Sequence, residues 1–205
     1  MKRPLLTLFY FSLGLLSPSH AEKTSKPNVI VFLVDDYDKP ETSPYGGKVL
    51  TPNLDRLAKE GMICHNAHVT STVCTPSRYT FLTGRYASSS HSKTFLEECP
   101  RGTQALPAFN VGLESDRMNV GRVLADAGYA TGFVGKYHVH DMDHGNEGSL
   151  FGDLEVPKNA EYTEELNNRK FKLEKLQRNL VKKNGFTWAK NIYWENLKSP
   201  FKGHN

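Results

Sequence analysis

This chain of 205 residues has little excess charge, few cysteines and no long apolar run. Its formal net charge is +4, and two of the positive residues, Lys2 and Arg3, lie at the extreme N-terminus, so no basic face for nucleic acid is indicated. The apolar stretch from Leu5 to Leu16 is shorter than the roughly 20 residues of a transmembrane helix. We therefore expect one sizeable core, no nucleic-acid partner and no stable membrane span.

The first 21 residues have the layout of a secretory signal peptide. Two basic residues precede the apolar stretch, and Ser19-His20-Ala21 offers small residues at both cleavage positions. No cysteine follows closely, which argues against a lipoprotein. An uncleaved membrane anchor is the alternative. The favoured interpretation is removal of residues 1–21 and export of residues 22–205 to the periplasm or the exterior.

Strand and helix patterns alternate over residues 28–135. The run Asn28–Val34 is continuously apolar, which predicts a strand buried on both faces, as in a parallel sheet. Thr51 and Thr75, each followed by proline, are typical of helix starts. Further strands are expected within 62–69 and 129–135, and helices over 51–61, 75–82 and 119–127. This alternation predicts an α/β/α sandwich around a mostly parallel sheet.

The segment 161–183 is rich in charge and carries one apolar stripe. The stripe consists of Leu166, Leu173, Leu176 and Leu180. Such a pattern is typical of an amphipathic helix that either binds a partner or lies solvated on its own domain, and ordinary patterning favours the second. The aromatic-rich segment 185–197 predicts another core element. Long irregular loops are expected over 88–112 and 138–157, which is usual for substrate-facing insertions.

The segment 74–78, Cys-Thr-Pro-Ser-Arg, carries the most specific chemical pattern in the chain. Cys74 directly precedes an expected helix N-terminus, where backbone N–H groups and the helix dipole attract anions. Arg78 follows four positions later, so its permanent charge lies on the same helix face. A cysteine in this setting, followed by Leu82-Thr83-Gly84, is very rarely structural.

Two acidic residues, Asp35 and Asp36, follow the expected strand at its carboxyl end, the edge where open α/β sheets bind ligands. Adjacent carboxylates repel each other unless a cation holds them, and their hard oxygen atoms suit Ca²⁺ or Mg²⁺. A solvated acidic turn is the alternative. The presence of Cys74 downstream favours the metal site.

The segment 128–138 ends in Gly-Lys-Tyr-His. Lys136 and His138 are two positions apart, so on an extended strand end both side chains face the same way. One cation and one imidazole suit the neutralisation of an oxyanion and the handling of a leaving-group proton. A P-loop is excluded because Tyr137 takes the place of Ser or Thr. The polar cluster His138, His140, Asp141, Asp143 and His144 indicates a substrate loop rather than a second metal site, because its spacing fits no ligand set.

Together these segments resemble the two signatures of type I sulfatases over roughly residues 27–138. The resemblance implies the alkaline-phosphatase-like α/β/α fold, and oxidation of Cys74 to formylglycine by a formylglycine-generating enzyme. The implied metal ligands, for Ca²⁺ in preference to Mg²⁺, are Asp35, Asp36 and the modified Cys74. The implied catalytic residues are Cys74, Arg78, Lys136 and His138. The hydrated aldehyde would attack a sulfate ester, and export and loop length favour a carbohydrate ester.

The chain departs from the family pattern in two ways. Tyr37-Asp38 and Thr72 differ from the usual residues, and no segment downstream of His138 supplies the family's remaining metal pair, His and Lys. We therefore expect the N-terminal part of a sulfatase catalytic domain, inactive by itself. The alternatives are a phosphonate or phosphate monoester hydrolase of the same fold, and a non-catalytic relic that binds sulfated glycans.

The chain has three cysteines, and an odd number leaves at least one cysteine outside any disulfide within an exported chain. With Cys74 assigned to the modification, Cys64 and Cys99 remain. They could form a disulfide or stay as two buried thiols, and the sequence slightly favours the thiols.

Overall fold

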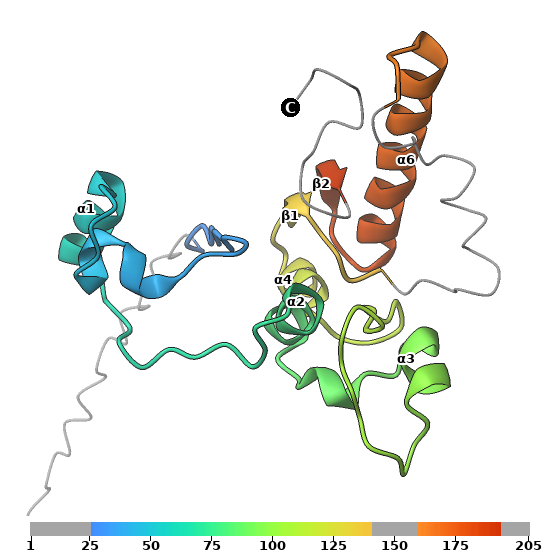
Figure 1. Ribbon diagram of the computed structural model, residues 1–205, viewed down its shortest axis with the longest axis horizontal. Helices are drawn as coiled ribbons and strands as arrows, with labels where there is room; N and C mark the ends of the chain where they lie inside the picture. The colour runs from blue at the N-terminus through green and yellow to red at the C-terminus, as the bar shows by residue number, and fades with distance from the viewer. Residues whose placement is uncertain (1–25, 141–159, 194–205) are drawn as a thin grey trace, which may run out of the picture. The chain divides into compact units, whose positions relative to one another are not determined.

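The computed structural model describes residues 26–140 and 160–193. The chain divides into two units, Met1–Val34 and Asp35–Asn205, and the described residues of the first unit form no helix or strand. The expected signal peptide and residues 141–144 of the polar cluster lie outside the described residues. The second unit contains the 3₁₀-helices η1 (Lys39–Glu41), η2 (Ser43–Tyr45) and η3 (Ala87–Ser89), the α-helices α1 (Pro52–Glu60), α2 (Cys74–Thr83), α3 (Lys93–Glu98), α4 (Val120–Asp126) and α6 (Glu164–Lys183), and the strands β1 (Gly132–Lys136) and β2 (Trp188–Tyr193) (Figure 1).

The two strands form a parallel sheet in which Gly132 pairs with Trp188 and Lys136 pairs with Tyr193. A bulge interrupts the register between Val134 and Gly135. Parallel neighbours need a long crossover, and the chain makes it through α6, which packs beside β2 (Figure 1). The strand–helix–strand unit confirms the expected α/β fold class with parallel pairing.

Three expected helices, α1, α4 and α6, occur in the segments that the sequence predicts. Helix α1 begins with Pro52 after the N-cap Thr51 and is closed by Gly61. At α4, the side chain of Asn119 accepts a hydrogen bond from the backbone N–H of Arg122, and at α6 Thr163 accepts one in the same way. The side chains of Asn119 and Thr163 thus satisfy backbone N–H groups that have no partner inside their helices.

Helix α2 begins two positions earlier than its sequence predicts. Cys74 is the first helical residue and Val73 is the N-cap, whereas we expected Thr75 to be the cap. Pro76 is tolerated at the third position because the N–H groups of the first turn have no helical partner in any case. Cys74 therefore belongs to the first turn of α2, and Arg78 follows it one turn later on the same helix.

Two predicted strands are wrong. The run Asn28–Val34 forms no strand, and its side chains are exposed, Ile30 by 78% and Phe32 by 89%. Residues 62–69 likewise form no strand. A strand is stable only when its backbone pairs with a neighbour, and the described residues provide neither segment with a partner strand. The third expected strand exists, but β1 begins at Gly132 rather than at Tyr129.

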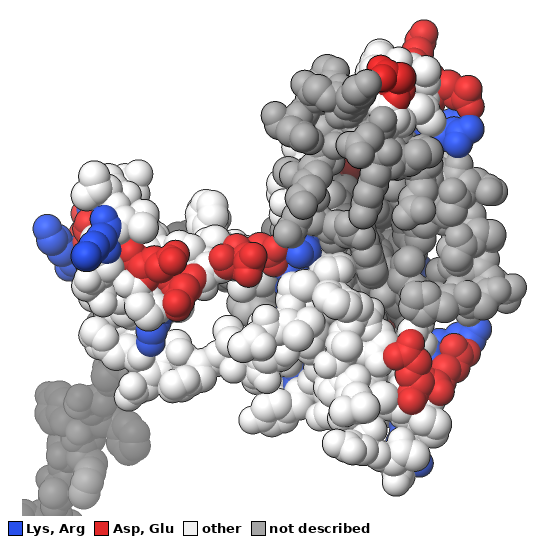
Figure 2. All heavy atoms as spheres, viewed as in Figure 1, with Lys and Arg blue, Asp and Glu red and all other residues white. Residues whose placement is uncertain are grey.

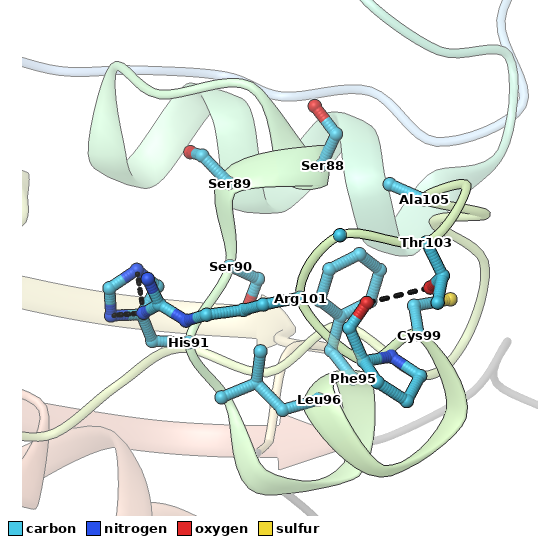
Figure 3. A pocket seen from close by; sticks show the side chains of 12 residues that line it. Ser88, Ser89, Ser90, His91, Phe95, Leu96, Cys99, Arg101, Thr103 and Ala105 are labelled. Atoms are coloured by element: carbon cyan, nitrogen blue, oxygen red, sulfur yellow. Dashed lines mark hydrogen bonds between the residues drawn. The ribbon is translucent and has the colours of Figure 1, made fainter.

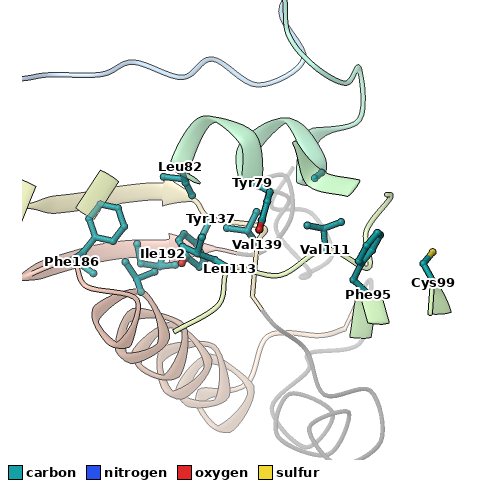
Figure 4. Packing of buried hydrophobic residues seen from close by; sticks show 13 residues of the cluster. Tyr79, Leu82, Phe95, Cys99, Val111, Leu113, Tyr137, Val139, Phe186 and Ile192 are labelled. Carbon is teal, nitrogen blue, oxygen red and sulfur yellow. The ribbon is translucent and has the colours of Figure 1, made fainter. Parts of the chain in front are cut away.

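The core joins α2, the strands and α6 (Figure 4). Tyr79 of α2, Tyr137 after β1 and Val181 of α6 are fully buried. On α6 the buried residues are Gln177 and Val181, and the leucine stripe is half-buried. Helix α6 thus lies on its own domain, as the favoured interpretation of its pattern predicts. The further residues of the core cluster are Leu82, Ala87, Phe95, Cys99, Val111, Leu113, Val139, Phe186, Ala189 and Ile192.

Candidate active site

A three-residue ion cluster joins the segment after Val34, helix α2 and the end of β1. Asp35 accepts hydrogen bonds from Arg78 Nη2 at 2.8 Å, through Oδ1, and from Lys136 Nζ at 2.9 Å, through Oδ2. The Arg78 and Lys136 side chains are only 7% and 8% exposed, and that of Asp35 is 28% exposed. Two cations that have left water need a counter-charge, which Asp35 supplies.

The guanidinium of Arg78 also binds the backbone. Its Nη1 donates to the carbonyl oxygen of Lys136 at 2.7 Å. The planar fork of arginine allows these two bonds from one group, so Arg78 holds both the Asp35 carboxylate and the last residue of β1.

A second contact brings Cys74 and His138 together. Cys74 Sγ lies 3.2 Å from His138 Nδ1. His138 follows β1 with a φ of 52°, in the left-handed region, so the chain has turned out of the strand conformation there. Cys74, Arg78, Lys136 and His138, which two separate motifs supply, are thus brought to one place with Asp35.

One residue beside this site was not predicted. The ring of Phe109 lies 5.5 Å from the imidazole of His138, at an interplanar angle of 33°. Phe109 is 60% exposed. It comes from the irregular segment between α3 and α4, where no periodicity or motif marks one aromatic residue, and the only hint was the general expectation of a substrate-facing loop.

The charges of the site follow from its packing. Burial alone would raise the pKa of Asp35, but the hydrogen bonds and charges of Arg78 and Lys136 hold that pKa below its usual value. Burial, together with the positive charges of Lys136 and Arg78, lowers the pKa of His138 to about 4. At neutral pH Asp35 is therefore ionised and His138 is neutral. A neutral imidazole has one nitrogen that can accept a proton.

The start of α2 has the character of an anion site. Thr75 is fully buried, and its hydroxyl has no hydrogen-bond partner among the described residues. The same holds for Nε of the buried Arg78. Helix N-terminal N–H groups attract negative charge, and donors in buried positions are costly to leave without a partner. This donor set therefore fits an oxyanion held beside residue 74.

The described side chains supply only some of the ligands that a metal ion would need. Asp35 and Asp36 have the hard oxygen atoms that Ca²⁺ prefers, and Asp36 is exposed with a left-handed φ of 55°. Both oxygens of Asp35 are engaged by Arg78 and Lys136. Within the part of the chain that the structure describes, no three His, Cys, Asp or Glu residues form a group able to hold a metal. The described donors are fewer than the six to eight oxygens that Ca²⁺ takes.

His140, Cys64 and Cys99 take other positions in the fold. His140 is buried, and its ring lies 4.8 Å from that of Tyr137. Cys64 and Cys99 are free thiols, which excludes the disulfide in this structure, and Cys64 is exposed rather than buried.

On the face drawn in Figure 2, the described Lys and Arg side chains lie in small groups interspersed with Asp and Glu. None of the helices in residues 26–140 and 160–193 is both long and apolar enough to cross a membrane.

Comparisons with known proteins agree with the motifs. The family model described as Sulfatase matches residues 27–197. Human steryl-sulfatase is 35% identical over 140 residues, which cover 68% of this chain and 23% of that protein. Two proteins of Bacteroides thetaiotaomicron also match. The N-acetylglucosamine-6-O-sulfatase is 34% identical over 136 residues (66% of this chain, 22% of that protein), and the N-acetylgalactosamine-6-O-sulfatase is 35% identical over 121 residues (58% and 22%).

The chain spans about a fifth of the length of the curated relatives it matches. The matched region nevertheless includes every residue of the ion cluster, of the Cys74–His138 pair and of the α2 N-terminus. The chain therefore belongs to the sulfatase family.

Proposed function

We propose that this protein hydrolyses sulfate esters at the site around residue 74. One observation carries the proposal: Cys74, in the first turn of α2, lies 3.2 Å from the imidazole of His138 and one helical turn from the buried Arg78. An oxyanion substrate there would meet helix N–H groups, two cations and a proton acceptor, all positioned in advance. Such pre-positioned charge is a main source of rate enhancement in enzymes.

Position 74 needs a stronger nucleophile than an unmodified thiol for this reaction, and we propose that Cys74 is oxidised to formylglycine by a formylglycine-generating enzyme. As its hydrate, this group would supply one hydroxyl that attacks sulfur and a second hydroxyl whose proton is removed when sulfate is expelled. Cysteine or serine at this position offers only one such atom. The sulfatase relatives and the Cys-Xaa-Pro-Ser-Arg motif support this assignment.

The neighbouring side chains have separate roles in this proposal. His138 Nδ1, within hydrogen-bond distance of the residue 74 side chain, accepts a proton there, because its low pKa keeps it neutral. Lys136 neutralises the oxyanion, and Arg78 holds residue 74 and the sulfate oxygens. In the structure both cations bind Asp35 instead. Substrate binding therefore requires at least one of them to share its charge between Asp35 and the sulfate.

We also propose that Asp35 and Asp36 contribute to a Ca²⁺ site, with Mg²⁺ the less favoured metal. The ion would neutralise sulfate charge and lower the pKa of a bound hydroxyl. The carboxylates have the right chemistry, but other oxygen donors must complete the coordination. Since Arg78 and Lys136 neutralise Asp35 in the described structure, metal binding would replace some of that positive charge.

The substrate we favour is a sulfated carbohydrate. Two of the relatives are named for sulfated amino sugars, whereas steryl-sulfatase is named for a steryl ester. The N-terminal residues 1–21, with their signal-peptide pattern, support export of the remaining chain to the periplasm or the exterior, where such carbohydrates occur.

The test is made on the full-length gene product, expressed with and without a formylglycine-generating enzyme. The tryptic peptide that contains residue 74 should react with a hydrazide probe only after co-expression, and hydrolysis of 4-nitrophenyl sulfate should appear in the same sample. Cys74→Ala should abolish both signals, whereas Cys64→Ala, which removes the exposed thiol, should retain them. An unmodified thiol after co-expression would contradict the proposal.

The second candidate function is hydrolysis of phosphate or phosphonate esters, because the same donor set accepts any tetrahedral oxyanion. Paired assays with 4-nitrophenyl sulfate and 4-nitrophenyl phosphate separate the two activities. A higher kcat/KM for the phosphate would favour this alternative. Binding of sulfated glycans without turnover, despite a modified residue 74, would favour the non-catalytic relic.

A further inference from the structure

A cavity of about 320 Å³ lies within the segment that connects α2 to α4. It is lined by residues of η3 and α3 and by the chain from Cys99 to Ala105 (Figure 3). None of its lining residues belongs to the candidate active site. The volume is at the lower end of the range of about 300–1,000 Å³ that is usual for small-molecule sites, so it suits one sugar-sized ring.

The lining combines hydroxyl groups with one permanent cation. The lining includes Ser88, Ser89 and Ser90 from η3 and its C-cap, and Arg101 and Thr103 from the chain after α3. Among the lining residues in the described part of the chain, none is acidic. Leu96 of α3 adds an apolar surface, behind which Phe95 is almost fully buried. Hydroxyls that can donate and accept, beside an apolar wall, suit a ring that carries several hydroxyl groups of its own.

The cation is positioned to accept an anion. Arg101 is exposed, and its Nη2 lies 2.9 Å from His91 Nε2, which Figure 3 shows at the edge of the cavity. This bond joins a charged donor to a ring that accepts without negative charge. A hydrogen bond from arginine to an oxyanion is shorter and about twice as strong as a neutral bond. An anionic group could therefore replace or share the contact to His91 at a gain in free energy.

The walls are held by bonds inside the segment. The hydroxyl of Ser90, which is 2% exposed, lies 3.1 Å from that of Ser92, and Ser92 in turn accepts from the backbone N–H of Gly112 at 3.0 Å. Cys99 Sγ accepts from the N–H of Leu106 at 3.4 Å, and Thr103 donates to the carbonyl of Pro100 at 2.6 Å. A cavity formed by a bonded segment needs little reordering when a ligand enters.

We propose that this cavity is a second binding site, for a sugar that carries an anionic group such as a sulfate ester or a carboxylate. Arg101 would bind the anionic group, and Leu96 would contact an apolar ring face. Ser88 would bind ring hydroxyls, and Ser89 and Thr103, whose hydroxyls donate to backbone carbonyls, would accept from them. The same segment continues to Phe109, which contacts His138. A sugar held here would belong either to a distant unit of a chain-like substrate or to a free monosaccharide.

The experiment measures binding to the full chain without turnover, so its result does not depend on the proposed hydrolysis. Glucose 6-sulfate, glucuronate, glucose and inorganic sulfate are titrated separately, and dissociation constants are followed by ligand-observed NMR. Glucose 6-sulfate and glucuronate should each bind at least about tenfold more tightly than glucose or inorganic sulfate, since a charge-assisted bond and the ring contacts act together. Equal binding of glucose and the two anionic sugars would overturn the proposal.

Matched variants locate the site. Arg101→Gln should weaken binding of the anionic sugars by about tenfold or more, and Ala105→Trp should fill the cavity with the cation still present. Arg56→Gln, an exposed arginine on α1 outside the lining, should leave binding unchanged. Lys136→Met removes a cation of the candidate active site and so reports any sugar bound there. Loss of binding in Lys136→Met together with normal binding in Arg101→Gln and Ala105→Trp would show that the sugars bind at residue 74, and would overturn the proposal.

The length of the ligand is tested with a sulfated disaccharide. If it binds tenfold more tightly than glucose 6-sulfate, and if Ala105→Trp abolishes this gain in affinity, the ligand is chain-like. If the disaccharide shows no gain in affinity, the ligand is a monosaccharide.

Discussion

His138 Nδ1 lies 3.2 Å from Cys74 Sγ, although the two residues are 64 positions apart in the chain. Cys74 stands in the first turn of α2, and His138 stands in the left-handed turn just after β1. Neither residue can reach the other by local structure. Their contact depends on the packing of α2 against the chain after β1, where Tyr79 and Tyr137 are both fully buried.

The contact predicts that His138 is needed for turnover. In the modified full-length gene product, His138→Ala should lower kcat by about 10²-fold or more, because a positioned proton acceptor typically contributes at least that much. KM should change less, since Arg78 and Lys136 still bind the oxyanion. His68→Ala, a change at an exposed loop histidine, is the control. A His138→Ala enzyme with kcat within twofold of wild type would show that this imidazole takes no part in the reaction.

Phe109 is expected to contribute to substrate binding. Its exposed ring beside His138 offers an apolar face to the group that leaves with the ester oxygen. Phe109→Ala should raise KM for an aryl sulfate several-fold, and Phe109→Tyr, which keeps the ring, should restore it. Phe171→Ala on α6, at another exposed phenylalanine, should have no effect. If Phe109→Ala left kcat/KM unchanged, the ring would only cover His138.

The ion cluster predicts a stability difference between two carboxylates. Asp35→Ala leaves the buried Arg78 and Lys136 without their counter-charge, and should lower the free energy of unfolding by about 1–3 kcal/mol. The loss should stay below the largest values known for broken buried ion pairs, because Asp35 is itself partly exposed to water. Glu165→Ala, which breaks an exposed pair with Arg169, should cost no more than about 0.5 kcal/mol. Urea titrations measure both values. Equal losses would mean that the cluster is no more than a surface ion pair.

A buried carboxylate outside the site is expected to matter more for stability. Glu114 is 5% exposed and accepts hydrogen bonds from the Tyr79 hydroxyl at 3.0 Å and from the backbone N–H of His91 at 2.6 Å. It therefore ties α2 to the segment that forms the cavity. Glu114→Ala should lower the free energy of unfolding by about 2–4 kcal/mol, since several buried donors lose their acceptor.

Glu97→Ala provides the matched control for Glu114, because Glu97 is 55% exposed and lies 3.9 Å from Lys93. Thermal and urea unfolding should show little change in this variant. A similarly small change in Glu114→Ala would contradict the structural role of its buried hydrogen bonds.

His140 should make the fold less stable in acid. Burial, followed by the charge of His138, lowers the pKa of His140 to about 3 from an ordinary value of 6.5. Above pH 6.5 the residue is neutral in both the folded and the unfolded chain. As pH falls from 6.5 towards 3 the unfolded chain binds a proton that the folded chain does not, so stability falls, by up to about 1.4 kcal/mol per pH unit.

Replacing His140 removes this linkage. His140→Phe should show a shallower loss of stability between pH 6.5 and pH 4 than wild type, measured by urea unfolding at each pH, whereas His68→Phe should keep the wild-type slope. A slope that His140→Phe leaves unaltered would place the acid sensitivity elsewhere, for example at His138.

Local signals in the sequence were enough to predict several elements. Thr51-Pro52 with Gly61 predicts α1, and Asn119 with the following apolar spacing predicts α4. Caps and helical periodicity act within a few residues, so they are readable without the fold. The two motifs that contain Cys74 and Lys136 likewise identify the family from the sequence alone, because their residue types and order are themselves the signal.

The strands show where local signals fail. The apolar run Asn28–Val34 predicts a strand but forms none, whereas Gly132–Lys136, with two glycines, forms one because β2 pairs with it. Helix hydrogen bonds close within a segment, and strand hydrogen bonds need a partner that is distant in the chain. Apolar composition therefore does not decide whether a strand exists.

The sequence by itself determined the family, the location of the main helices and the residues that could carry chemistry. Only the tertiary structure decided that Asp35 binds Arg78 and Lys136, that Cys74 meets His138, and that the unmarked Phe109 lies beside them. These contacts join segments far apart in the chain. They arise because burial of the core around Tyr79 and Tyr137 brings α2 against the end of β1, and charges withdrawn from water must then find partners among the residues that meet there.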